Sequence, residues 1–277
     1  MTPAELTGYL AFTTQNRFPV LIKGKPGIGK SDIVEQAAAA AGAQLIISHP
    51  VVSDPTDFKG LPFPKQDGTA EFLPFGDLQQ LIKAEEETIF FLDDLGQAAP
   101  SVQAACMQLL LARRINSHKV SDKVTFVAAT NRREDKAGVN GMLEPVKSRF
   151  ISIIELEVKT TDWMKWAFAH NMPTELIGFI QFKPDLLDNF TASKDIVNSA
   201  SPRTVAAVGR QQLAKIPKAY EYEAYKGAAG EAFAREYVEF LRVFRELPSI
   251  DSIIKKPTSA NVPNDISTVY AISCALA

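Results

Sequence analysis

The stretch GKPGIGKS, residues 24 to 31, decides the fold of this chain. It fits the pattern G-x-x-x-x-G-K-[S/T], and it stands between a strand-like run at 18–24 and a helix-like run at 30–42. In that context the glycines let the backbone wrap around an anion, so that amide hydrogens and the helix N-terminus face phosphate oxygens. The alternative, a plain glycine-rich turn, requires neither neighbour. The predicted nucleotide-binding residues are Gly24, Lys25, Pro26, Gly27, Ile28, Gly29, Lys30 and Ser31.

Two side chains of this loop carry its chemistry. Lys30 adds a positive charge toward the β and γ phosphates, and the Ser31 hydroxyl is a ligand for Mg²⁺. The pattern therefore predicts ATP and Mg²⁺ as cofactors. When no phosphate is bound, the Lys30 ammonium is expected to face solvent.

Strand-like and helix-like runs alternate outward from the loop through the first half of the chain. The strand-like runs are continuous and apolar, as a parallel sheet covered on both faces requires. Beyond Thr160 the β signal stops, so we predict an α/β domain at 1–156 and a smaller helical lid domain at 157–277. The predicted strands are 18–24, 44–49, 88–92, 123–130 and 150–156, and helices are predicted at 30–42, 76–87 and 101–114, the last with Ser101 as its N-cap.

The segment IFFLDDLGQAAP, residues 89–100, carries an apolar strand directly into two aspartates. Adjacent carboxylates repel each other, so the pair is either a solvated turn or a cation site. If this strand lies near the first, its carboxyl end faces the phosphates, as open α/β sheets place their ligands. Asp93 then binds Mg²⁺ together with Ser31, and Asp94 points at the water that attacks the γ-phosphate. We interpret the pair as a Walker B element.

Three further polar residues fit a nucleotide site. Asn131 ends the fourth strand, where an amide can orient a water or a phosphate oxygen, although asparagine also often simply ends a strand. Arg149 precedes the fifth strand and is either a helix C-terminal cation or an arginine that stabilises a transferring phosphoryl group from outside its site. Arg203, in SPRT at 201–204, falls in the first turn of a helix, where a cation opposes the helix dipole unless an anion is near.

Composition limits the other classes. The 277 residues include 30 basic and 32 acidic ones, a net charge of −2, which argues against a strongly basic nucleic-acid-binding domain but leaves a local basic patch open. No apolar run approaches the roughly 20 residues that span a bilayer, and the acidic N-terminus is unlike a signal peptide. Cys106 and Cys274 are predicted to be free core thiols, so a reducing cytoplasm is the expected setting.

These elements, in this order, resemble an AAA+ ATPase, and the detail resembles the MoxR branch. The segments that carry the resemblance are SDPTDFKGLP at 53–62, LDDLGQAAPSVQAACMQLLLARRI at 92–115, TNRREDKAGVNGMLEPVKSRF at 130–150, and SPRT. The resemblance implies a P-loop NTPase sheet ordered 5-1-4-3-2 and flanked by helices, with Asn131 as sensor 1. It also implies Arg149 as an arginine finger, Arg203 as the sensor 2 arginine, ring hexamers, and partners with a von Willebrand factor A domain.

One residue departs from that family. The family usually has Glu where this chain has Asp94, and aspartate is shorter by one carbon–carbon bond, about 1.5 Å. A general base must reach the proton that it accepts, so the shorter side chain either slows hydrolysis or is compensated by a shift of its strand; hydrolysis is predicted in both cases.

Two insertions are predicted to form β-hairpins, near 57–75 and 113–123. The first has a predicted turn at QDGT, residues 66–69, and four phenylalanines. We expect these rings to pack the hairpin on its own sheet; the alternative is a pore-lining grip on a polypeptide. In the second domain, Trp163 and Trp166 are predicted core residues, and 264–277 is predicted to be a closing helix.

The sequence thus predicts a Mg²⁺-ATP-dependent ring ATPase that remodels or activates a protein partner, with Asp94, Asn131, Arg149 and Arg203 as its catalytic residues. A nucleotide-gated assembly scaffold with little turnover is the alternative. A monomeric P-loop kinase or GTPase is disfavoured, because the guanine motif N-K-x-D is absent from the sequence and Arg149 would have no neighbour to serve.

Overall fold

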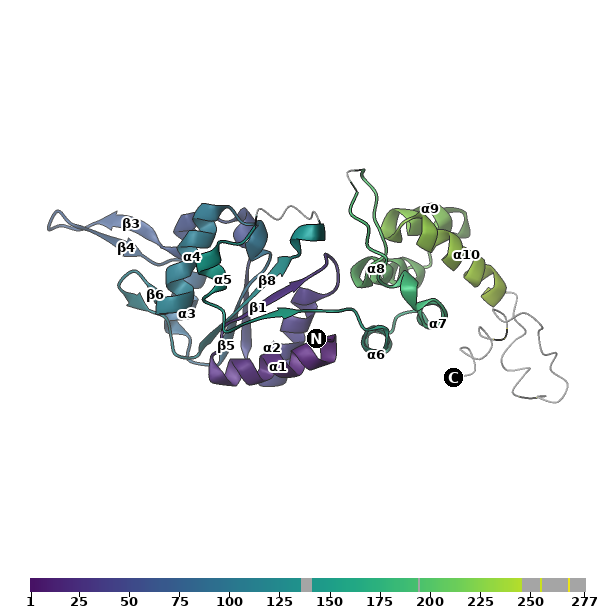
Figure 1. Ribbon diagram of the computed structural model, residues 1–277, viewed down its shortest axis with the longest axis horizontal. Coiled ribbons are helices and arrows are strands. Elements are labelled where there is room, and N and C mark those ends of the chain that lie inside the picture. Colours follow the sequence, from purple (N-terminus) through teal and green to yellow (C-terminus); the bar gives the residue numbers. More distant parts are fainter. Residues whose placement is uncertain (136–140, 194, 246–254, 256–268, 270–277) are drawn as a thin grey trace. The chain divides into compact units, whose positions relative to one another are not determined.

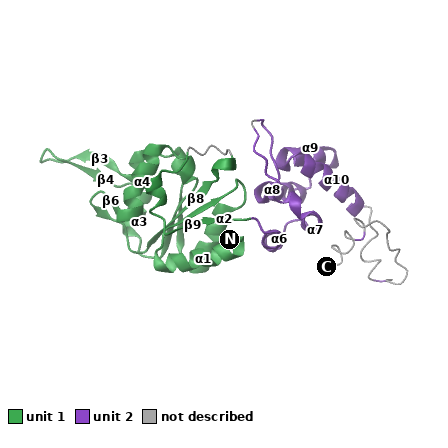
Figure 2. Cartoon of the chain, in the orientation of Figure 1, with its two compact units in different colours: residues 1–157 green, residues 158–277 purple. Residues whose placement is uncertain are grey.

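The computed structural model describes residues 1–135, 141–193 and 195–245, together with Lys255 and Val269. The chain divides into two compact units, 1–157 and 158–277 (Figure 2). The predicted closing helix at 264–277 lies outside the described residues, except for Val269. Among the described residues, no helix combines the length and the apolarity that crossing a bilayer requires.

The first unit is built on a five-stranded parallel sheet in the order β2-β5-β8-β1-β9 (Figure 1). Numbered along the chain, these five strands stand in the order 5-1-4-3-2 when read from β9, so the predicted fold class is confirmed. β5 is buried along its whole length, as a central parallel strand requires. The five strands are β1 (Val20–Gly24), β2 (Gln44–Ser48), β5 (Thr88–Leu92), β8 (Val124–Asn131) and β9 (Ser152–Glu155).

Helices cover both faces of this sheet (Figure 1). Phe90 and Phe126 point to one face, where they meet edge to face within a core that α3, α4 and α5 complete. On the other face α1 and α2 pack against each other, and α2 contacts β2, β5 and β8. The helices are α1 (Pro3–Asn16), α2 (Lys30–Ala41), α3 (Asp77–Lys83), α4 (Pro100–Ala112) and α5 (Glu144–Lys147).

Helices α3 and α4 have boundaries that differ from the prediction. α4 begins at Pro100 with Ala99 as its N-cap, two residues before the predicted Ser101 cap. Proline is preorganised for the first helical position and lacks an N–H that would need a partner there. α3 ends at Lys83 and not at residue 87, so the three successive glutamates 85–87 fall outside the helix.

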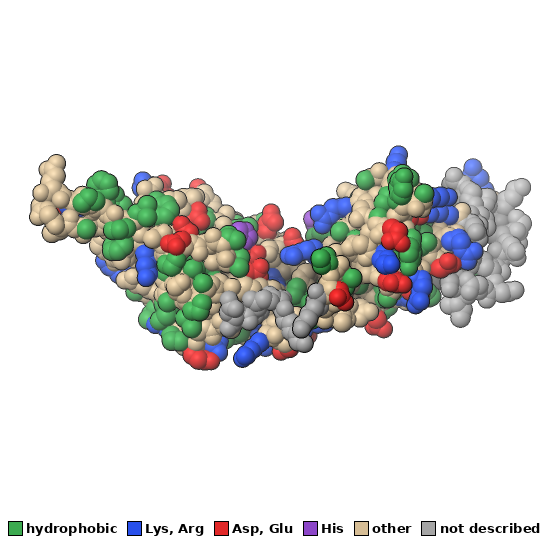
Figure 3. All heavy atoms as spheres, turned by 90° about the horizontal axis from the view of Figure 1, so that it is seen from above, with side chains coloured by type: hydrophobic (Ala, Val, Ile, Leu, Met, Phe, Trp, Pro, Cys, Tyr) green, Lys and Arg blue, Asp and Glu red, His purple; other side chains and the backbone are tan. Residues whose placement is uncertain are grey.

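The first insertion forms a two-stranded antiparallel hairpin, β3 (Leu61–Pro64) with β4 (Ala70–Leu73). Its predicted turn is present, with Gly68 in the left-handed region at φ +82°. The expectation that the aromatic rings pack on their own sheet is wrong for Phe63 and Phe72, which are 57% and 42% exposed. A two-stranded hairpin has no layer behind it, and hydrophobic side chains gather on its surface (Figure 3). Only Phe58, in the 3₁₀ turn η2 (Pro55–Phe58), is buried in the core.

The second insertion is shorter. β6 (Arg114–Ile115) pairs with β7 (His118–Lys119), and the turn between them reaches the first insertion, because Asn116 Nδ2 donates to the Lys59 carbonyl at 2.5 Å.

The second unit is helical in its described part, as Figure 2 shows. Its core is aromatic: Phe179 contacts Phe233, Tyr237 and Phe240. Trp163 is buried and Trp166 partly so. Its helices are α6 (Thr160–Ala169), α7 (Thr174–Phe182), α8 (Pro202–Leu213), α9 (Lys218–Ala229) and α10 (Glu231–Arg245), with a 3₁₀ turn η5 (Pro184–Leu186).

Candidate nucleotide-binding site

The loop at 24–31 connects the carboxyl end of β1 to the amino end of α2. Gly27 and Gly29 adopt φ values of +74° and +92°, a region that residues with a Cβ rarely enter. Gly29 is the N-cap of α2 and no side chain caps the helix, which leaves first-turn N–H groups for phosphate oxygens. A Cβ at Gly24 would lie 2.5 Å from the Ile28 side chain, so the loop closes tightly on itself. This backbone fits a polyphosphate.

The Lys30 side chain lies inside this loop. It is only 7% exposed, so the expectation that its ammonium faces solvent is wrong. Its Nζ donates to the carbonyls of Gly24 at 3.1 Å and Lys25 at 2.9 Å, and to Asn131 Oδ1 at 2.6 Å. A buried ammonium without hydrogen bonds is costly, and the loop carbonyls supply them. The positive charge of Lys30 is therefore held by hydrogen bonds to the loop and to Asn131 at the end of β8.

Ser31 and Asp93 meet directly. Ser31 Oγ donates to Asp93 Oδ2 at 2.7 Å, although the two residues are 62 positions apart. Asp93 stands at the carboxyl end of β5, where its N–H donates to the Ser48 carbonyl at the end of β2. Among the described residues no group of three His, Cys, Asp or Glu side chains forms a metal cage. A hydroxyl and one carboxylate are instead a donor set that fits Mg²⁺, which takes its other ligands from water and substrate phosphates.

Asp94 and Asn131 are the remaining predicted residues that lie at the site. Asn131 ends β8, between β5 and β1, so its amide lies between the two halves of the site. Its Oδ1 accepts from Lys30, and its Nδ2 donates to Asp94 Oδ1 at 3.4 Å. The structure therefore brings five predicted residues into one hydrogen-bonded cluster at the carboxyl ends of β1, β5 and β8: Lys30, Ser31, Asp93, Asp94 and Asn131.

Arg149 is not part of this cluster. It follows α5, and two residues later the Ile151 N–H donates to the Pro19 carbonyl, just before β1 begins. Arg149 thus stands toward the amino end of β1, whereas the loop at 24–31 leaves its carboxyl end. The five-residue strand separates the two ends by roughly 13 Å.

Arg203 lies in the second unit. It is the second residue of α8, whose N-terminus Ser201 caps in a reciprocal pair of hydrogen bonds with Thr204. No carboxylate forms an ion pair with Arg203 among the residues that the structure describes.

Sequence reasoning missed an ionic cluster beside the site. Arg132 follows Asn131 and binds Asp135 through both carboxylate oxygens, at 2.8 and 2.9 Å, which raises the pKa of the guanidinium. Its Nη1 also donates to Glu155 at 3.4 Å. A hydrogen bond from Lys23 chiefly lowers the pKa of Glu155. The cluster ties the segment after Asn131 to β1 and β9. Opposite charges three residues apart, in the sequence RRED, are the signal that could have indicated it.

Gln103 is a second residue that the sequence did not single out. It is fully buried on α4, where its Nε2 donates to the carbonyls of Ala98 and Gly141, each at 3.1 Å. Its Oε1 accepts from the Leu143 N–H at 3.0 Å. One buried amide therefore holds the segment that leads into α5 and Arg149.

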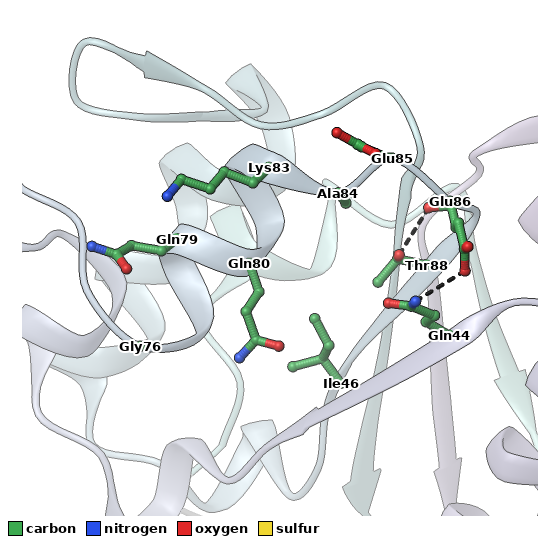
Figure 4. A pocket seen from close by; sticks show the side chains of 10 residues that line it. All are labelled: Gln44, Ile46, Gly76, Gln79, Gln80, Lys83, Ala84, Glu85, Glu86 and Thr88. Carbon is green, nitrogen blue, oxygen red and sulfur yellow. Dashed lines mark hydrogen bonds between the residues drawn. The ribbon is translucent and has the colours of Figure 1, made fainter.

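A pocket of about 450 Å³ lies elsewhere on the first unit (Figure 4). Gln44 and Thr88, the first residues of β2 and β5, help to line it together with α3. It is thus at the amino ends of the strands. Open parallel sheets bind nucleotides at the carboxyl ends, so this pocket is not the nucleotide site.

The fold and the cluster around the loop at 24–31 together define a P-loop nucleoside triphosphatase.

Comparisons with known proteins narrow this class. A family model described as AAA domain (dynein-related subfamily) matches residues 19–150. Midasin from Giardia intestinalis is 26% identical over 172 residues, which are 58% of this chain and 4% of that protein. The chain therefore spans a small part of that relative. On these grounds, the first unit is similar in sequence to the AAA domains of AAA+ ATPases.

Solved structures agree on the fold. Two mutant forms of RuvB from Thermotoga maritima match with a TM-score of 0.50, at 16% and 14% identity. Each match covers 99% of this chain and 80% of the RuvB chain. At this identity the likeness concerns the fold alone.

Proposed function

We propose that the chain is a Mg²⁺-ATP-dependent ATPase of the MoxR type, which assembles as a hexameric ring in the cytoplasm and remodels or activates a protein partner. The observation that carries the proposal is the cluster of Lys30, Ser31, Asp93, Asp94 and Asn131 at one edge of the sheet. It joins a phosphate-binding cation, a metal-binding pair and a candidate base.

Each residue has a role in this proposal. The loop at 24–31 binds the phosphates through its N–H groups, and Lys30 exchanges its present carbonyl partners for phosphate oxygens. Ser31 and Asp93 hold Mg²⁺, which neutralises charge on the phosphates when it is bound. Asp94 accepts the proton of the attacking water, and Asn131 orients that water or a γ-phosphate oxygen.

Arg149 is proposed to act on the neighbouring subunit's nucleotide. It stands toward the amino end of β1, away from its own loop at 24–31. Among the described residues no carboxylate forms an ion pair with it, its Nη1 donates to the Pro145 carbonyl, and its Nε is buried with no hydrogen-bond partner. A half-buried guanidinium at that edge is available to a phosphate of another copy, which requires a ring.

The second unit is proposed to act as a lid. Arg203 in the first turn of α8 adds a cation where the helix dipole disfavours one, and an anion nearby would offset that cost. We assign it the sensor 2 role, in which it contacts the γ-phosphate.

The partner is proposed to be a protein, one with a von Willebrand factor A domain being the form that the MoxR resemblance favours. The exposed apolar hairpin β3–β4 supports a polypeptide contact. The net charge of −2 gives no support to nucleic acid. A second candidate, a nucleotide-gated scaffold with little turnover, is favoured by one observation: the short Asp94 side chain is already hydrogen-bonded at Oδ1.

Mixed assemblies test the proposal. Arg149→Ala subunits should bind ATP normally and hydrolyse it poorly, whereas Lys30→Ala subunits should lose most of their ATP affinity but keep Arg149. Mixing the two should restore part of the turnover, and wild-type turnover per subunit should rise with protein concentration as rings form. Absence of rescue in mixed assemblies that are shown to form would refute the trans role. Turnover that stays near zero at every concentration would favour the scaffold.

A further inference from the structure

The carboxylate of Asp94 is held by a residue of its own turn. Gln97 Nε2 donates to Asp94 Oδ1 at 2.8 Å, and the Gln97 N–H donates to the Asp94 carbonyl at 2.9 Å. Both residues are half-buried, and they bracket the 3₁₀ turn η3 (Leu95–Gln97), in which Leu95 is fully buried in the core. The side-chain bond is therefore anchored at both ends by packed backbone.

The two oxygens of this carboxylate have different surroundings. Oδ1 accepts from Gln97 and also, at 3.4 Å, from Asn131. Among the described residues nothing donates to Oδ2. Asp94 has a left-handed backbone, with φ +57° and ψ 32°, and its N–H donates to Asp93 Oδ1. Backbone and amides thus fix the plane of the carboxylate and leave one oxygen for an incoming water.

We propose that Gln97 is a positioning residue matched to the short side chain of Asp94. It fixes Oδ1, so that Oδ2 meets the attacking water; this rests on the proposed role of Asp94 as the base. The match is one of length. Asp94 has one methylene and Gln97 has two, so the pair has three in total. Glutamate opposite asparagine has the same total, whereas glutamate opposite glutamine has one more and crowds the carboxylate.

The length match gives a specific set of variants. Gln97→Met removes the donor and keeps an unbranched side chain of similar length. Asp94→Glu extends the acid alone, and the double variant Asp94→Glu with Gln97→Asn restores the total. Gln80→Met is the matched control, because Gln80 Nε2 donates to Asp77 Oδ1 at 3.4 Å with the same spacing of three residues, at an exposed position of α3.

The experiment measures kcat and KM for ATP in assembled protein, and ADP affinity by calorimetry. Gln97→Met should lower kcat about 10- to 100-fold, because a charge-assisted hydrogen bond and the orientation of the base are lost. KM and ADP affinity should stay within about twofold, since Gln97 belongs to η3 and not to the loop at 24–31. The kcat of Asp94→Glu should fall by a similar factor, and the kcat of the double variant should be at least about tenfold higher than that of Asp94→Glu. Gln80→Met should match the wild type.

Separate outcomes overturn separate claims. If Asp94→Asn hydrolyses ATP at the wild-type rate, Asp94 is not the base, and the inference falls with it. If Asp94→Asn is inactive but Gln97→Met keeps the wild-type kcat, only the positioning role is wrong. If Gln97→Met does not fold, as judged by circular dichroism, the double variant decides: turnover no higher than that of Asp94→Glu refutes the length match.

Discussion

The buried ammonium of Lys30 makes a stability prediction that a solvent-facing lysine would not make. Lys30→Met keeps the length and the burial of the side chain but deletes three hydrogen bonds, to Gly24, Lys25 and Asn131. A hydrogen bond of a charged group contributes about 1.5–3 kcal/mol net, so the three together contribute about 5 kcal/mol or more. Removing the buried charge, whose desolvation costs several kcal/mol, and adding an apolar group regain about 3 kcal/mol. We therefore expect the first unit to be destabilised by about 2 kcal/mol.

The assay is thermal unfolding without nucleotide. For a unit of this size, about 2 kcal/mol corresponds to a fall in Tm of roughly 4–8 °C. Both tryptophans, Trp163 and Trp166, are in the second unit, so calorimetry, which detects the unfolding of either unit, is the suitable measurement. Lys59→Met, at an exposed position of the same unit, is the control.

A second reading comes from adding nucleotide. Mg²⁺-ADP should raise the Tm of the wild type and of Lys59→Met, because ligand bound only by the folded state stabilises it. It should raise that of Lys30→Met much less. If Lys30→Met has the wild-type Tm without nucleotide, the three hydrogen bonds contribute nothing, and the stated reason for the burial of Lys30 is wrong.

Two further predictions concern buried polar groups. Gln103→Leu should lower the free energy of unfolding by about 2–4 kcal/mol, because the carbonyls of Ala98 and Gly141 and the N–H of Leu143 then lose their partner. Urea unfolding measures this change, and an unchanged midpoint would contradict it. Burial raises the pKa of the Cys106 thiol to about 12, so in a Cys274→Ser background a thiol reagent at pH 8 should label Cys106 only in denaturant. Because the folded state then holds that proton more tightly than the unfolded chain, stability should fall as the pH rises through the unfolded thiol's value of about 8.5, and rapid labelling of native protein would refute the burial.

The parallel strands and the meeting of distant motifs were predictable from local pattern, whereas the strand order was implied by the resemblance to AAA+ ATPases. Continuous apolar runs such as TIFFL predict buried parallel strands, and a P-loop predicts where their carboxyl ends must converge. The contact of Ser31 with Asp93, across 62 residues, is a consequence of that convergence.

The remaining features depend on tertiary contacts that no local pattern contains. Lys30 is satisfied by carbonyls of its own loop, which requires the closed shape of the loop and not only its composition. Gln97 and Gln103 are ordinary polar residues in sequence, and each acquires its role from the groups that the fold places beside it. Phe63 and Phe72 look like core residues, yet a two-stranded hairpin gives them nothing to pack against.

The outer edge of strand β3 in the same hairpin contains two prolines, which disfavour pairing with another molecule. A strand that exposes apolar side chains invites a strand of another molecule to pair along its free edge. β3 contains Pro62 and Pro64, and proline has no N–H to donate. In an antiparallel ladder alternate residues direct their N–H groups to the same side, so the pairing with β4 uses Leu61 and Phe63 and the outer edge of β3 has no donors at the proline positions. The outer edge of β3 therefore offers an incomplete backbone template for pairing with another molecule, although the side chains of the hairpin are apolar and exposed.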